Sequence, residues 1–259
     1  MSYWQERIKQ AQDAMTNKSH KQIDKQMKKY YQQAAKRVIK DFESTYNKIL
    51  AQVAEGKEPT PALLYRLDSY WQQQSALRNE LNRLGERQVA LLTKEFELNF
   101  FDVYYSIALE GERTFSDIDK AAVRQMLQTT WVADGKNFSQ RVWDNISRLL
   151  ETLNEGLAEC VATGKKTTEL KHILQERFGV SYRRADTLVR TELVHIQTRA
   201  AEERYKSYGI KEVEVLVDPD DRTCDLCRSL VGKRYPINAA PVLPLHPNER
   251  CCLVPVINK

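Results

Sequence analysis

Four of the five cysteines of this 259-residue chain lie between residue 224 and the carboxyl terminus, together with one of its four histidines. Cys224 and Cys227 are separated by two residues, and His246 and Cys251 follow farther along. Two cysteines at this spacing on a tight turn can direct both sulfurs at one point, and zinc takes four S or N ligands at tetrahedral corners. The spacing therefore predicts a zinc site made of Cys224, Cys227, His246 and Cys251.

Other interpretations of these cysteines stay open. Cys252 adjoins Cys251 and is the alternative fourth ligand, but it begins the apolar run 252–256 and can face a core. A redox Cys-x-x-Cys is expected after a βαβ pattern, which the sequence does not show. Inert thiols clustered by chance, or disulfides, are the remaining options. Because the amino terminus lacks the pattern of a signal peptide, we expect synthesis in a reducing cytosol, where disulfides are rare.

The predicted zinc site is structural. Four protein ligands leave no position for water, whereas a catalytic zinc keeps one and has an acid or base beside it. Glu249 is near enough in sequence to act as a base, but a solvated turn residue is the role we expect. The sequence shows no phosphate-binding glycine loop, nucleophile elbow or paired nuclease carboxylates. We therefore predict no catalytic residues, no small-molecule substrate and no enzyme activity.

Long helices must position this site. Only nine of the 259 residues are glycine, and apolar residues recur at helical spacing over most of the first 209 residues. We expect Thr60 and Pro61 to begin a helical stretch that breaks near Leu84–Gly85, and Ser116 to cap the next helix. Further helices are expected over 138–161, from Thr167 to Phe178–Gly179, and over 182–208, with Gly164 and Gly209 as stops. Cys160 is expected to be a small core residue.

Beyond Gly209 the pattern changes to short strands. Residues 212–217 alternate and are rich in valine, and we expect two more strands around 233–237 and 252–256. Most of the eight prolines lie in this tail, which disfavours helices. The prediction is a mostly α fold, with long helices followed by a small C-terminal zinc-stapled module with short β-strands. Its parts are a helical N-terminal region (1–115), a helical middle (116–209) and a β-containing zinc-binding tail (210–259).

Charge permits a nucleic-acid partner without requiring one. The net charge is +5, and no apolar run is long enough for a membrane helix, so no membrane partner is expected. A basic run is interleaved with tyrosines, and either DNA phosphates or solvent could face it, of which we favour solvent. This run comprises Lys25, Lys28, Lys29, Lys36, Arg37 and Lys40. Arg190 and Glu192 are expected to form an ion pair rather than an active centre, with His195 placed to hydrogen-bond to Glu192.

Two strings in the tail, Asp220–Lys233 and Pro244–Val256, resemble the C-terminal signature of the phage Mu protein F-like minor head family. The preceding helix, with its Arg190-x-Glu192 and its final glycine, is similar too. The resemblance covers roughly residues 130–256. The chain departs from the family at one point, because relatives often have Cys-Arg-Cys after His-Pro-Asn, where this chain has Glu249-Arg250-Cys251.

The resemblance implies a phage minor head protein that acts in head morphogenesis. Such a protein would be a low-copy procapsid component associated with the portal, acting in head assembly, DNA packaging or ejection. Its partners would be portal and capsid proteins, and its location the host cytoplasm during assembly and then the virion, in the head interior or portal region. Two alternatives come from other classes. One is a nucleic-acid-binding zinc module, and the other is a toxin-like or nuclease-like enzyme.

Overall fold

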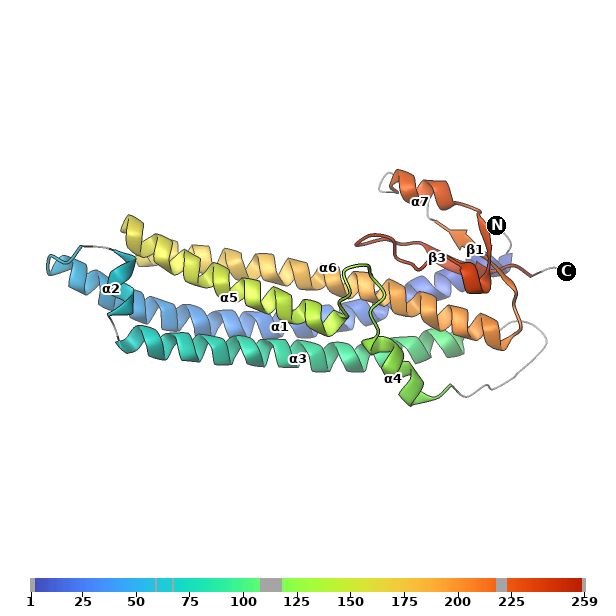
Figure 1. The fold of residues 1–259 in the computed structure, drawn as a ribbon, viewed down its shortest axis with the longest axis horizontal. Helices are drawn as coiled ribbons and strands as arrows, with labels where there is room; N and C mark the ends of the chain where they lie inside the picture. Colours follow the sequence, from blue (N-terminus) through green and yellow to red (C-terminus); the bar gives the residue numbers. More distant parts are fainter. Residues whose placement is uncertain (1–2, 59, 67, 108–117, 218–222, 258–259) are drawn as a thin grey trace. The chain divides into compact units, whose positions relative to one another are not determined.

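The computed structural model describes residues 3–58, 60–66, 68–107, 118–217 and 223–257. The chain is mostly helical, with short antiparallel strands near its carboxyl end (Figure 1), which confirms the predicted fold class. Among the described residues, no helix has a stretch both long and apolar enough to span a lipid bilayer. In chain order the elements are α1 (Tyr3–Ala54), α2 (Pro61–Tyr65), α3 (Asp68–Ser106), α4 (Lys120–Gln128), α5 (Phe138–Thr163), α6 (Thr167–Ser207), β1 (Glu212–Leu216), α7 (Asp225–Leu230), β2 (Arg234–Pro236), η1 (Ile237–Ala239) and β3 (Cys252–Pro255).

The chain forms two compact units, each assembled from segments that are distant in sequence. Unit 1 contains residues 1–23, 91–138 and 187–259, and unit 2 contains residues 24–90 and 139–186. Because the units interleave along the chain, they do not test the boundaries expected after residues 115 and 209, which stay predictions.

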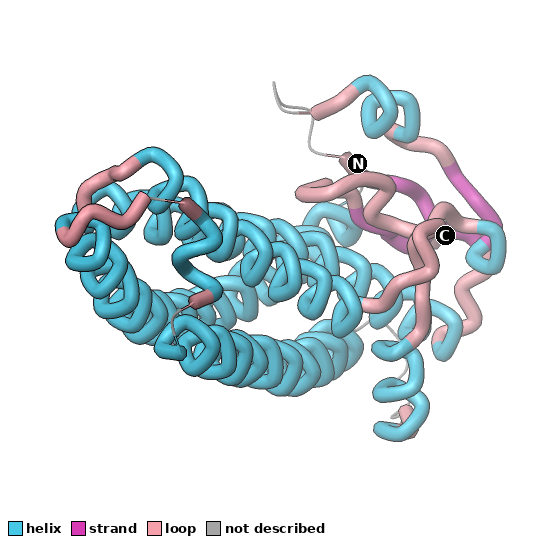
Figure 2. The backbone as a smooth tube through the Cα atoms, turned by 60° about the vertical axis from the view of Figure 1, so that its left-hand side comes forward, coloured by secondary structure: helices cyan, strands magenta, loops and turns pink. Residues whose placement is uncertain are grey.

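Unit 2 consists mainly of four helical stretches, from α1, α3, α5 and α6, that run side by side (Figures 1 and 2). Apolar side chains that recur at helical spacing are fully buried between them, including Phe42 and Tyr46 of α1, Leu81 of α3 and Leu153 of α5. Cys160 is also buried here, as predicted.

One polar residue from each helix meets in the core of unit 2. The Tyr31 hydroxyl of α1 lies 3.2 Å from Ser181 Oγ of α6 and 3.4 Å from Gln88 Oε1 of α3. Asn145 Nδ2 of α5 donates to the Tyr31 hydroxyl at 3.1 Å and to the Ser181 carbonyl at 2.9 Å. This layer favours one alignment of the four helices, because a shifted helix would leave buried polar groups unpaired.

Helix α3 continues through Gly85, so the break predicted at Leu84–Gly85 is wrong. The interruption lies earlier, between the end of α2 and the start of α3. A Cβ atom on Gly85 would lie 2.6 Å from Cζ3 of Trp143, closer than two carbon atoms can approach. The glycine therefore lets the α5 indole pack directly on the α3 backbone, rather than ending the helix.

Helix α6 is likewise continuous, so the end predicted near Phe178–Gly179 is wrong. A Cβ atom on Gly179 would meet only Arg183 Nη1, at 3.6 Å, and the glycine has no left-handed φ that would stop the helix. Gly164 and Gly209 do follow the ends of α5 and α6, with φ of +63° and +69°. This left-handed conformation is the usual glycine stop, as predicted.

The starts of two shorter helices also bear on the sequence predictions. Thr60 is the N-cap residue of α2, but its side chain makes no capping hydrogen bond, and Pro61 occupies the first turn as predicted. Helix α4 is capped by Asp119, whose side chain accepts a hydrogen bond from the backbone N–H of Ala121. The predicted cap residue Ser116 lies outside the described residues.

A three-stranded antiparallel sheet, in the order β2-β1-β3, belongs to unit 1. Val213 of β1 pairs with Tyr235 of β2 on one side and with Pro255 of β3 on the other. The three strands predicted in the tail are therefore confirmed, each one or two residues shorter than expected. Because β3 begins at Cys252, the sheet fixes the backbone immediately after Cys251.

Helices α1 and α6 hold this sheet. A small apolar cluster joins the first turns of α1 to the sheet, and its members are Ile8, Leu216, Cys252 and Val254. The buried Tyr205 hydroxyl of α6 donates to the Leu253 carbonyl of β3 at 3.0 Å, and Gln12 Nε2 of α1 donates to the Tyr205 hydroxyl at 3.4 Å. Cys252 thus faces a core, as expected, and the tail is attached to rigid helices.

Candidate metal centre

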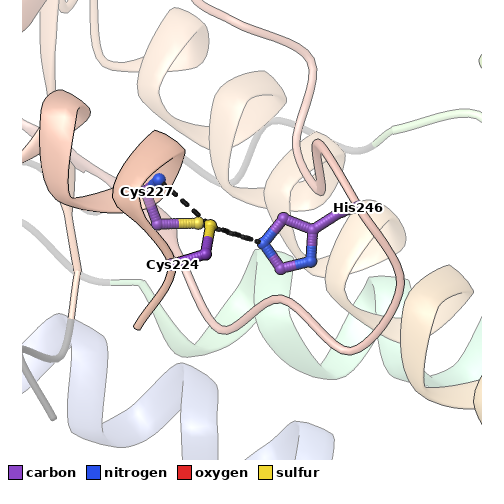
Figure 3. Close-up of side chains that lie close together, drawn as sticks. All are labelled: Cys224, Cys227 and His246. Carbon is purple, nitrogen blue, oxygen red and sulfur yellow. Dashed lines mark hydrogen bonds between the residues drawn. The ribbon is translucent and has the colours of Figure 1, made fainter. Parts of the chain in front are cut away.

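Cys224 and Cys227 lie at the start of the short helix α7. Cys224 is the N-cap residue, and its Sγ accepts a hydrogen bond from the backbone N–H of Cys227 at 3.4 Å. The backbone N–H of Arg228 donates to the Cys224 carbonyl at 2.9 Å and closes the first turn. Because the cap residue directly precedes this turn, the two sulfurs come out beside each other (Figure 3).

His246 reaches these sulfurs from the loop that precedes β3, defined here as the ligand loop, residues 243–251. Its Nε2 lies 3.3 Å from Cys224 Sγ and 3.2 Å from Cys227 Sγ (Figure 3). The other ring nitrogen, Nδ1, lies 3.0 Å from the Pro247 carbonyl. A carbonyl only accepts, so Nδ1 carries the proton in the neutral ring and Nε2 presents its lone pair to the sulfurs. The same hydrogen bond raises the pKa of His246.

These three donors fit a tetrahedral zinc ion. With Zn–S near 2.3 Å and Zn–N near 2.0 Å, ligand atoms at tetrahedral corners lie about 3.5–3.8 Å apart. The donor atoms of Cys224, Cys227 and His246 all lie within 4.8 Å of one another. Small side-chain movements would bring them to zinc-binding geometry.

A second group of donors adjoins the first. Cys227, Glu249 and Cys251 also have donor atoms within 4.8 Å of one another, and all three residues are buried. Cys227 belongs to both groups. The predicted fourth ligand, Cys251, therefore lies in the second group, beside the shared sulfur.

Glu249 is the residue of this centre that sequence reasoning placed wrongly. It was expected to be a solvated turn residue, yet it is only 3% exposed. Its Oε2 accepts hydrogen bonds from the backbone N–H groups of Leu245 and His246, the latter at 3.3 Å, whereas Oε1 has no hydrogen-bond partner. Glu249 therefore closes the turn that carries His246. Its position between His246 and Cys251 was the available signal.

Without a cation, two of the thiols are held in the protonated form. Burial raises the pKa of Cys227 to about 11 and raises the pKa of Cys251 far above that of a free thiol. The hydrogen bond from the Cys227 backbone N–H lowers the pKa of Cys224. Metal ligation requires thiolates, so a bound cation must displace protons here, and its affinity must fall as the pH falls.

Helix α6 anchors the ligand loop. His195 Nδ1 lies 3.0 Å from the carbonyl of Leu243, the first residue of that loop. The backbone N–H of Asn248 donates to Thr191 Oγ1 at 3.4 Å, one helical turn away. The turn that carries His246 is therefore held by the helix, which limits how far His246 can move.

A tryptophan covers this anchor. The Trp131 indole stacks on the His195 ring, with centroids 4.1 Å apart and planes 8° from parallel, and its Nε1 donates to Glu192 Oε2 at 3.0 Å. The sequence predicted a hydrogen bond between His195 and Glu192, but in the structure His195 Nδ1 lies beside the Leu243 carbonyl. Arg190 is exposed whereas Glu192 is buried. Burial lowers the pKa of His195 to about 4, so the ring is neutral near pH 7. No sequence pattern predicted that Trp131 would stack on His195, which lies much farther along the chain.

The basic run lies on α1, within unit 2. All six of its side chains are exposed: Lys25, Lys28, Lys29, Lys36, Arg37 and Lys40. Arg37 Nη1 donates to both carboxylate oxygens of Glu80 of α3, at 2.9 and 3.1 Å. DNA contact through this face stays a prediction.

Comparison with known families bears on the same part of the chain. Residues 151–253 match the model of the family described as phage Mu protein F like protein. This segment, named the Mu F-like segment below, is similar to that family. The match confirms the resemblance inferred from the two strings in the tail and the Arg-x-Glu helix. The Mu F-like segment begins within α5, contains the whole of α6 and ends in β3, so it includes every predicted metal ligand. No curated protein and no solved structure matches the chain.

Proposed function

We propose that this protein is a minor structural component of a phage head, acting in head morphogenesis. The supporting observation is that the Mu F-like segment contains both the Cys/His cluster and the helix that anchors its loop. In this proposal a few copies associate with the portal and capsid proteins in the procapsid and act in assembly, DNA packaging or ejection. The protein forms in the host cytoplasm and ends in the virion, at the head interior or portal region.

The proposed role of the cluster is to hold one structural Zn²⁺. Cys224, Cys227 and His246 supply three ligands, and the fourth comes from the neighbouring buried group, where the sequence predicts Cys251. A bound zinc would cross-link α7 to the ligand loop. The tail needs such a link because strands of five, three and four residues bury too little to hold the loop by packing alone. The role is therefore structural rather than catalytic.

Zinc content of the purified full chain tests this role. The expected result is one zinc per chain in the wild type and loss of that zinc in Cys224→Ser. Cys160→Ala is the matched control, because Cys160 is buried in α5 of unit 2 and belongs to neither donor group. Unchanged zinc in Cys224→Ser, or a wild type without zinc, contradicts the proposal.

Procapsid assembly tests the partner. Co-expression with the portal and capsid proteins of the same phage should give heads that contain a few copies of the chain, and fewer copies when the portal is omitted. Heads that exclude the chain whether or not the portal is present would contradict the proposed association.

A second candidate function is nucleic-acid binding by the basic run of α1. The observation in its favour is that all six basic side chains are exposed along one helix. Phosphate contacts release counterions, so retention on DNA should weaken as salt rises, and should weaken further in a Lys25→Gln, Lys28→Gln, Lys29→Gln triple variant. Retention that is independent of both salt and these substitutions rules this function out.

A further inference from the structure

We infer that the Glu249 carboxylate, rather than the Cys251 thiolate, is the fourth ligand of the metal centre. The inference rests on the zinc centre proposed above and identifies its fourth ligand. It starts from the state of the two Glu249 oxygens, which differ in their surroundings.

The Glu249 carboxylate is buried with one oxygen unsatisfied. Oε2 is held by the backbone N–H groups of Leu245 and His246, but Oε1 has no hydrogen-bond partner although the residue is 97% buried. Among the ion pairs of the described residues, none includes Glu249. The Cys251 thiol lies beside this carboxylate but is only a weak hydrogen-bond donor. A buried carboxylate without a cation is strongly unfavourable, and buried carboxylates are paired with a cation or bind a metal.

Cys227 sets the position where a cation would bind. A carboxylate oxygen of Glu249 lies within 4.8 Å of Cys227 Sγ, and this sulfur also belongs to the group formed with Cys224 and His246. An ion bound by Cys227 would therefore lie within reach of Glu249. Two thiolates, one imidazole and one carboxylate form a donor set that zinc accepts at its usual tetrahedral distances.

Charge distinguishes Glu249 from Cys251 as the fourth ligand. If Cys251 bound the ion as a thiolate, three thiolates would surround it and the Glu249 carboxylate would remain buried beside them without a partner. If Glu249 binds the ion, the buried carboxylate gains a cation and Cys251 remains a neutral buried thiol, which behaves as a small apolar side chain. The second arrangement leaves one fewer negative charge in the buried site.

Cobalt(II) titration of the full chain separates the two ligand sets, because the intensity of sulfur-to-cobalt charge transfer rises with the number of bound thiolates. The variants are Glu249→Gln and Cys251→Ala. Glutamine keeps an oxygen that can accept from the Leu245 and His246 N–H groups, so it preserves the turn while removing the anionic donor. Far-UV circular dichroism checks that each variant is folded.

We expect Cys251→Ala to bind cobalt with wild-type charge-transfer absorbance. Glu249→Gln should keep that absorbance per bound ion and shift the ligand-field bands. It should also weaken cobalt binding more than about tenfold, which is the lower end of the loss in affinity when a residue that supports a metal ligand is mutated. A loss of about one third of the charge-transfer absorbance in Cys251→Ala, the share of one thiolate in three, overturns the inference. The Cys251→Ala result decides the question even if Glu249→Gln fails to fold.

Failure of the proposed zinc centre itself would give a different result in the cobalt titration. A wild-type chain that takes up no cobalt, or a Cys224→Ser chain that takes it up normally, overturns the proposed centre before the fourth ligand is considered. Normal cobalt binding and a wild-type spectrum in Glu249→Gln overturn only the role of Glu249.

Discussion

Acidification should weaken unit 1 through His195, the residue that anchors the ligand loop. Its ring is buried against Trp131, and burial lowers its pKa from 6.5 to about 4. An unfolded chain therefore binds a proton at this site at a higher pH than the folded chain does. The stabilisation is complete above the unfolded pKa and is lost as the pH falls from 6.5 toward 4.

The size of this effect follows from the two pKa values. Between pH 7 and pH 5, the free energy of unfolding should fall by about 2 kcal/mol from this residue alone. Other groups also contribute to the pH dependence, including Glu202, whose pKa is raised by burial and whose contribution has the opposite sign. A comparison with a variant that changes only His195 removes these shared contributions.

His195→Gln is that variant, because an amide can donate to the Leu243 carbonyl but does not titrate. Urea unfolding of zinc-loaded wild type and variant, followed by circular dichroism at pH 7 and pH 5, gives four free energies. The wild type should lose about 2 kcal/mol more than His195→Gln on acidification. Equal losses in the two proteins would refute the claim that a buried neutral His195 supports the loop.

Four further substitutions test contacts within unit 2. Gly85→Ala should destabilise the chain by about 1–3 kcal/mol because its Cβ atom would clash with Trp143. Gly179→Ala, in the open part of α6, should be neutral or stabilising by up to about 1 kcal/mol. Thermal melts in which Gly179→Ala is the less stable of the two would contradict the contact between Gly85 and Trp143. Tyr46→Phe removes a buried hydroxyl that lies 2.9 Å from the Cys160 carbonyl and 2.5 Å from the Lys165 carbonyl. It should cost about 1–2 kcal/mol in urea unfolding, so an unchanged midpoint argues against a hydrogen bond there. Arg37→Ala breaks the ion pair with Glu80 but should lower the free energy of unfolding by less than about 1 kcal/mol, because the arginine side chain is 53% exposed. A larger loss would show that this surface pair stabilises unit 2.

Local patterns predicted the elements of this fold more reliably than their breaks. Gly164 and Gly209 were recognised as stops because glycine there adopts a left-handed φ at the end of an apolar repeat. The same residue type misled at Gly85 and Gly179, which lie inside continuous helices. The difference at Gly85 is a contact with Trp143, a residue of another helix, and single-chain periodicity carries no record of such a contact.

The proximity of Cys224, Cys227 and His246 was predictable for a related reason. The Cys-x-x-Cys spacing is local, and α7 alone brings those two sulfurs together. His246 reaches these two sulfurs because the ligand loop folds back toward α7. The burial of Glu249 depends on how the ligand loop meets α7, and the anchoring of Leu243 by His195 depends on how that loop meets α6. The sequence encodes neither contact at a fixed spacing.

X-ray absorption at the zinc edge of the purified full chain tests the convergence of these ligands most directly. The account predicts sulfur neighbours near 2.3 Å together with nitrogen or oxygen neighbours near 2.0 Å around one tightly bound zinc, with the sulfur signal reduced in Cys224→Ser. Zinc surrounded by oxygen and nitrogen alone, with no sulfur neighbour, would contradict it.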